Sequence, residues 1–90
     1  MEGNTWITYE NCNVTARKCV EAGPVHVNLT LHQGNDDRYN LIIEAGIESI
    51  SVALRSETLE DAFQEADEFS KDYFLDRAKL MEEIAQRILG

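Results

Sequence analysis

The strongest constraint on the fold of this chain is a change in the period of its apolar residues near Ser56. Before Ser56, apolar and polar residues alternate and glycine-containing turns recur, which is typical of antiparallel strands. After Ser56, apolar residues recur every three or four positions without an intervening proline or glycine until Gly90, which is typical of a helix. We therefore expect a single α+β domain over residues 1–90, with a sheet part (1–56) and a helical part (57–90). The predicted architecture has two layers: an antiparallel meander of three to five strands and one long C-terminal helix.

The clearest strand is predicted over residues 25–31, where valine and leucine alternate with polar residues. One face of that strand is apolar and the other polar, as in an antiparallel sheet that is covered on one side. Residues 6–9 either extend a neighbouring strand or form a separate one. Further strands are predicted at residues 14–20, 39–45 and 49–55, with turns at residues 22–24, 33–37 and 45–48.

The helical segment is long for so small a sheet. Thr58 and Asp61 fit a capping box, in which the hydroxyl accepts from a backbone N–H and the carboxylate reaches back. An unbroken helix from there to Gly90 has about 31 residues and a length of roughly 46 Å, whereas a strand of seven to nine residues spans roughly 25–30 Å. Either the helix bends near residues 70–73, or its last third packs on another chain. The second alternative predicts a homodimer interface at Leu80, Met81, Ile84, Ile88 and Leu89.

The charge of the chain restricts its partners. Seventeen acidic residues and eight Lys and Arg give a net charge of −9 at pH 7. This charge opposes binding to nucleic-acid phosphates and to anionic membranes, and it attracts basic protein surfaces. The alternative is that the charge serves solubility alone. The first residues resemble no targeting segment and no apolar run reaches membrane-spanning length, so we expect a cytoplasmic protein, in the host cell if it is phage-encoded.

No motif indicates catalysis, a cofactor or a metal. His26 and His32 lie six residues apart on one strand face, roughly 20 Å, which is too far to share an ion. Cys12 and Cys19 have no metal-ligand spacing and are expected to be reduced thiols. Nothing resembles a nucleophile elbow, a glycine-rich phosphate loop or a zinc-protease helix. We therefore predict no catalytic, cofactor-binding or metal-binding residues and no enzymatic activity.

Acidic residues follow one side of the predicted helix at three- and four-residue steps. Acids in the first turn complement the helix dipole, but those beyond it have no such role, and like charges at these spacings cost stability. An evenly spaced line of carboxylates can mimic nucleic-acid phosphates and occupy a basic groove of a protein, whereas the alternative is a plain solvated face. The predicted partner-binding residues are Glu57, Asp61, Glu65, Glu68, Asp72 and Asp76.

Two resemblances extend this prediction. The hairpins followed by Ser56-Glu57-Thr58-Leu59-Glu60-Asp61-Ala62 resemble HicB-type antitoxins over residues 39–74, where a short sheet leads into a helix opening with a similar run. That resemblance implies a dimeric antitoxin or structural module that associates through the C-terminal helix. The small acidic sheet-plus-helix build is also similar to phage or mobile-element inhibitors of host defence, of the anti-CRISPR and anti-restriction kind. It implies a DNA-mimicking inhibitor that blocks a basic, nucleic-acid-handling surface of a larger protein.

Overall fold

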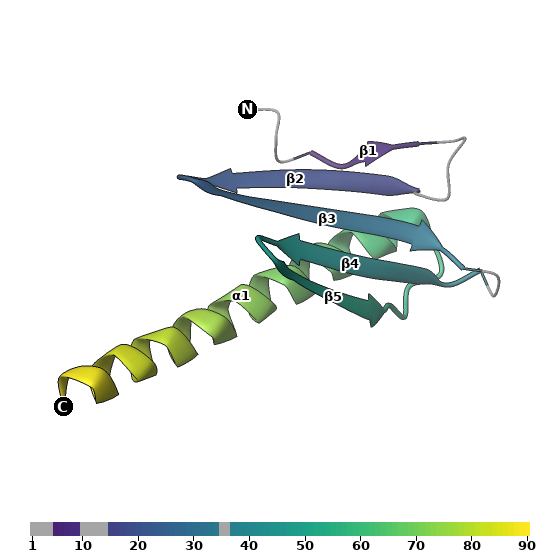
Figure 1. Ribbon diagram of the computed structural model, residues 1–90. Helices are drawn as coiled ribbons and strands as arrows, with labels where there is room; N and C mark the ends of the chain where they lie inside the picture. The colour runs from purple at the N-terminus through teal and green to yellow at the C-terminus, as the bar shows by residue number, and fades with distance from the viewer. Residues whose placement is uncertain (1–4, 10–14, 35–36) are drawn as a thin grey trace.

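The computed structural model describes residues 5–9, 15–34 and 37–90 and shows a five-stranded antiparallel sheet followed by one helix (Figure 1). The strands pair in chain order, so each strand is hydrogen-bonded to its sequence neighbours, and the predicted α+β meander is confirmed. The segment at 6–9 forms its own short edge strand rather than extending the next. The elements are β1 (Ile7–Thr8), β2 (Ala16–Ala22), β3 (Val25–Gln33), β4 (Tyr39–Ala45), β5 (Glu48–Ala53) and α1 (Leu59–Leu89).

The helix covers one face of the sheet, and the strand alternation determines which residues it covers. The prediction that the valines and leucines of β3 share one face is confirmed, because Leu29 and Leu31 are buried beneath the helix. In the register of the sheet, Leu31 pairs with Ala16 of β2 and with Leu41 of β4. The buried core is completed by other residues of this face and by the underside of α1: Tyr39, Ile43, Leu54, Ala62 and Ala66.

Both tight hairpins begin with a glycine in a left-handed conformation. Gly23 joins β2 to β3 with φ of 62°, and Gly46 joins β4 to β5 with φ of 65°. A positive φ at the first turn residue is the requirement of a type II′ turn, and glycine meets it without the steric cost that a Cβ brings. The predicted turns at 22–24 and 45–48 are therefore confirmed. Parts of the other predictions, namely Cys12, Val14 and the turn residues Asn35 and Asp36, lie outside the described residues.

The helix begins at the predicted N-cap, where the hydroxyl half of the predicted capping box is present. The Thr58 side chain accepts a hydrogen bond from the Asp61 N–H, at 3.2 Å. The buried residues of the helix, Ala62, Ala66 and Ser70, are small, and larger residues pack partly buried around them: Leu59, Phe63, Tyr73 and Phe74. Small side chains let the helix axis approach the strands closely, so that Leu31, Leu41 and Ile43 fill the space below it.

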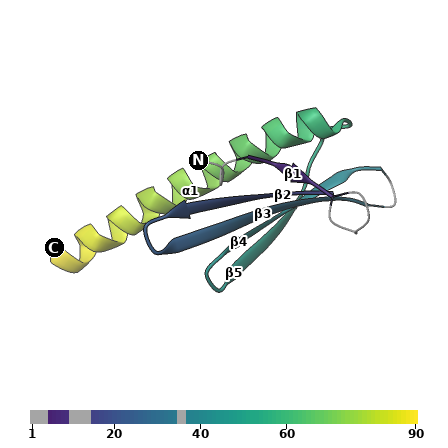
Figure 2. The same cartoon turned by 90° about the horizontal axis from the view of Figure 1, so that it is seen from above.

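The helix outruns the sheet. It runs from Leu59 to Leu89 as one uninterrupted element of 31 residues, and it extends beyond the strands as a straight rod (Figures 1 and 2). The bend considered near residues 70–73 is therefore absent. Every residue from Ala78 onward is exposed. We call residues 78–90 the tail.

Candidate functional site

The predicted line of acids lies along one side of α1, and most of its members are exposed. Asp61, Glu68, Asp72 and Asp76 follow each other at intervals of one or two turns, and Glu57 precedes them at the helix entrance. We call these five residues the acidic row. Within the described part of the chain none of the five pairs with a base, and the Gln64 side chain donates a long hydrogen bond of 3.5 Å to Glu68. The structure thus brings together five of the six predicted partner-binding residues on one open side.

Glu65 is different, because its carboxylate is turned back onto the chain that enters the helix. Its Oε1 accepts from the backbone N–H groups of Arg55 and Ser56, each at 3.0 Å, and from the Ser56 hydroxyl at 2.6 Å. Glu65 was predicted as a partner-binding residue, but its carboxylate is occupied by hydrogen bonds within the chain. The spacing of acids along the helix cannot separate Glu65 from the exposed acids, because its hydrogen-bond partners, Arg55 and Ser56, lie before the helix.

The surroundings of Glu65 favour its ionised form. Partial burial by itself raises the pKa of this carboxyl, but the hydrogen bonds from the Ser56 hydroxyl and from the Arg55 and Ser56 N–H groups together outweigh it. The pKa of Glu65 therefore lies below its ordinary value of 4.5. This carboxylate stabilises the β5–α1 connection, and we do not include it in the acidic row.

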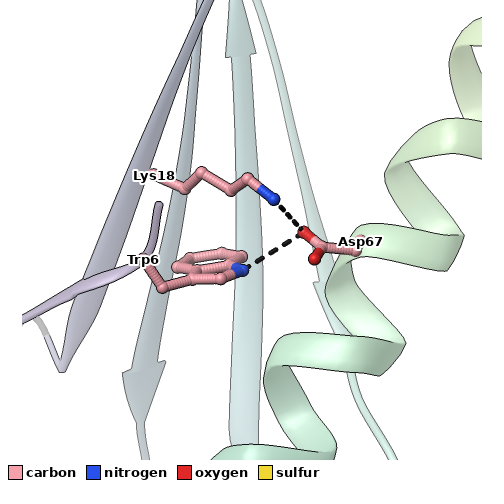
Figure 3. A network of polar contacts seen from close by, with 3 residues as sticks. All are labelled: Trp6, Lys18 and Asp67. Atoms are coloured by element: carbon pink, nitrogen blue, oxygen red, sulfur yellow. Dashed lines mark hydrogen bonds and ion pairs between the residues drawn. The ribbon is translucent and has the colours of Figure 1, made fainter. Parts of the chain in front are cut away.

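Asp67 is a second acid that serves the fold. Its Oδ1 accepts from the indole Nε1 of Trp6 at 3.1 Å and from the Lys18 ammonium at 2.9 Å (Figure 3). Trp6 stacks on Phe63 of the helix, with ring centroids 5.1 Å apart and planes inclined by 13°. The Lys18 Nζ also lies 5.8 Å from the centre of the indole ring. The network thus fastens the N-terminal edge of the sheet to the helix.

Sequence reasoning missed this network, although one signal for it was present. The inward face of β2 reads Ala16, Lys18, Val20, so that a lysine occupies the middle of an apolar face. Burial of a lysine ammonium costs free energy unless an acid pairs with it, so an acidic partner on the helix that faces β2 was to be expected. The sequence does not show which of the helix acids takes that role.

The inward face of the sheet is incompletely covered near the β2–β3 hairpin. A groove of about 580 Å³ lies there between the hairpin and the helix. Its walls are mainly apolar, and Val25 at the hairpin end is 50% exposed. We call this surface the groove. The polar residues at its wall are Lys18, Asp67, Ser70 and Lys71, and its apolar lining is Val20, Ala22, Val25, Val27, Leu29 and Phe74.

The predicted dimer-interface residues all lie in the tail, and all are exposed. Among the described residues eleven large hydrophobic side chains are exposed, and five of them belong to the tail. The exposed apolar surface is therefore concentrated rather than scattered. The five are Leu80, Met81, Ile84, Ile88 and Leu89.

The remaining candidate groups lie apart from these surfaces. His26 is on the outer face of the sheet, 3.2 Å from the Glu21 carboxylate, and Cys19 on the same face is a free, exposed thiol. No three His, Cys, Asp or Glu side chains of residues 5–9, 15–34 and 37–90 gather closely enough to hold a metal ion. In the same residues, no helix has both the length and the apolar character needed to cross a membrane.

The helix also divides by charge. Residues 57–76 contain eight acids and one base, whereas residues 77–90 contain three bases and two acids. The half that lies on the sheet is thus strongly negative, and the half that contains the tail is slightly positive.

Comparison of the chain with models of protein families, with curated proteins and with solved structures finds no match.

Proposed function

We propose that this protein is a non-catalytic binding protein whose acidic row engages a basic surface on a larger protein. The observation that carries the proposal is that the row is exposed and, within the described residues, unpaired with bases. Like charges three or four residues apart destabilise a helix. Two neighbouring acids outside the row, Glu65 and Asp67, are instead held by hydrogen bonds to other parts of the chain.

The shape of the row suits a groove that normally holds nucleic acid. From Asp61 to Asp76 it extends roughly 22 Å along the helix, and Glu57 lies just before the helix begins. Its charges stand about 5–6 Å apart where they are one turn apart, so they form a line rather than a cluster. A protein groove that binds phosphates carries a matching line of Lys and Arg side chains.

This arrangement favours the inhibitor class over nucleic-acid binding by the chain itself. A net charge of −9 repels phosphates, whereas it accelerates the encounter with a basic protein. We infer a mode of action in which the row occupies the nucleic-acid site of a host enzyme or effector complex, as an inhibitor of the anti-CRISPR or anti-restriction kind does.

A charge-matched pair of variants tests the proposal. In the test variant Glu68→Lys is combined with Asp72→Lys, on the row; in the control, Glu21→Lys is combined with Glu44→Lys, on the outer face of the sheet. All four side chains are exposed, and both variants change the net charge equally. Each protein is used to capture partners from host lysate, and the captured partner is then offered labelled nucleic acid.

The wild type and the control are expected to retain one basic partner and to displace its nucleic acid, and the test variant to do neither. Circular dichroism confirms that both variants fold. If the test variant retains and inhibits the partner as well as the control does, the row is a solvated face and the proposal fails.

A further inference from the structure

Two apolar surfaces of this molecule have no partner within the described residues: the tail and the groove. The tail is a rod with one apolar side and no surface against it. The groove is a hollow beside the helix, at the turn end of the β2–β3 hairpin. Exposed apolar surface concentrated in this way marks an interface.

The apolar side of the tail continues the side of the helix that lies on the sheet. Ala62, Ala66 and Ser70 are followed, about five turns later, by Leu80, Ile84 and Ile88. The first three are small and buried, and the last three are large and exposed. The apolar side of the tail therefore continues the side of the helix that contacts the sheet, but it carries larger side chains than Ala62, Ala66 and Ser70.

The tail cannot fill the groove of its own chain. The helix is continuous from Leu59 to Leu89, and the groove lies beside its middle, at Ser70, Lys71 and Phe74. A return of the tail to that position needs a loop, and no glycine or proline lies between Leu59 and Leu89. A tail that occupies this groove therefore belongs to another molecule.

We propose that the occupant is the tail of a second copy, so that two chains form an antiparallel dimer in which each tail lies in the other's groove. In a dimer with two-fold symmetry, the tail and the groove of both chains are covered, and no uncovered surface of either kind remains to bind a third chain. In this dimer the sheet-facing side of each tail rests on the partner's β2–β3 hairpin, and its adjoining side packs against the partner's helix near Phe74.

The charges of the helix favour this orientation. An antiparallel pair places the tail of one chain, whose two bases and two acids cancel, beside the strongly negative half of the other helix. A parallel pair instead places two halves with seven net negative charges side by side. Electrostatic complementarity of this kind fixes orientation and register.

The dimer leaves the acidic row accessible. The row residues Glu68 and Asp72 line the hollow beside β5, on the side of the helix opposite the groove. A dimer therefore presents two acidic rows, one on each copy. The inference is independent of the binding role proposed above, since each surface can be altered without the other.

The test uses sedimentation equilibrium of the full chain at about 100 μM with three single variants. Ile84→Asp places a charge on the tail, Val25→Asp places one in the groove, and Ile47→Asp is the control. Ile47 is fully exposed on the β4–β5 turn, away from the groove lining. The wild type and the control are expected at twice the 10.2 kDa of one chain, and the other two at the mass of one chain.

Mixing Ile84→Asp with Val25→Asp then separates the tail-in-groove dimer from other contacts. A mixed pair keeps one intact tail and one intact groove that fit each other, so weak dimerisation should return. A monomeric wild type would overturn the proposal. Loss of the dimer in Ile84→Asp alone, with Val25→Asp unaffected, would overturn it in favour of tail-to-tail pairing. Circular dichroism and urea unfolding establish that each variant is folded.

Discussion

The Arg77 guanidinium donates a hydrogen bond of 2.7 Å to the Glu48 carboxylate, and among the described residues this is the last hydrogen bond between helix and sheet. Arg77 also donates to the Tyr73 hydroxyl at 3.1 Å. These two contacts raise the pKa of Arg77 further above its ordinary value, so the group stays charged. The pair marks the point at which the helix leaves the sheet and the tail begins.

Asp67 should contribute more to stability than its neighbour Glu68. Replacing Asp67 by Ala removes the acceptor for Trp6 and leaves the largely buried Lys18 ammonium without its ion-pair partner. We expect a loss of about 1–2 kcal/mol in the free energy of unfolding. Glu68→Ala, the control, should change it by less than about 0.5 kcal/mol. Urea unfolding followed by fluorescence of Trp6, the single tryptophan, measures both; equal losses would contradict the assigned role.

Glu65 should make stability depend on pH in acid. Because its pKa is lowered in the folded state, the contribution of the ionised carboxylate is complete above the ordinary value of 4.5 and is lost as the pH falls through the lower, folded pKa. Glu65→Gln should therefore cost about 1–3 kcal/mol at pH 7. The difference from the wild type should shrink steadily below pH 4.5. A difference that is constant from pH 7 to about pH 3 would contradict the hydrogen bonding described here.

The Ser70 hydroxyl is buried without a hydrogen-bond partner among the described residues. Ser70→Ala should therefore be neutral or stabilising, by up to about 1 kcal/mol, because an unsatisfied polar group is removed with little change of volume. Ala66→Ser, one turn earlier at a fully buried position, is the reciprocal variant and should destabilise by about 1–3 kcal/mol. Thermal unfolding of both variants measures the effect, and a clear loss of stability in Ser70→Ala would show that the hydroxyl is satisfied.

Local signals were enough to predict most of the fold. Alternation identified β3, glycines identified the hairpin turns, and Thr58 located the start of the helix, because each pattern depends only on neighbours in sequence. Comparison of helix and strand lengths left two alternatives, a bend in the helix or packing of its last third on another chain. The structure shows a continuous helix that extends past the sheet, and the packing on another chain stays a prediction. Whether residues 6–9 form a separate strand could not be decided from the sequence, because the two residues of β1 are too few to show an alternating pattern.

The site was predicted less completely, for a physical reason. Glu65, Asp67 and Glu68 are alike in sequence, but the first accepts from the chain before the helix, the second from residues in β2 and before β1, and the third faces solvent. These roles depend on contacts between residues up to 61 positions apart. Helical spacing indicates which acids lie on the same side of the helix. It does not indicate which of them accept hydrogen bonds from residues outside the helix.

The binding role of the acidic row is tested most directly by the salt dependence of the association rate with the captured partner. For the wild type and for Glu21→Lys/Glu44→Lys, the rate should be high at about 50 mM salt and should fall steeply towards about 500 mM, because exposed charges are screened. For Glu68→Lys/Asp72→Lys it should be about tenfold lower at low salt and should converge with the wild-type rate at high salt. Equal rates and equal salt slopes for the two charge-matched variants would contradict a specific role of the row.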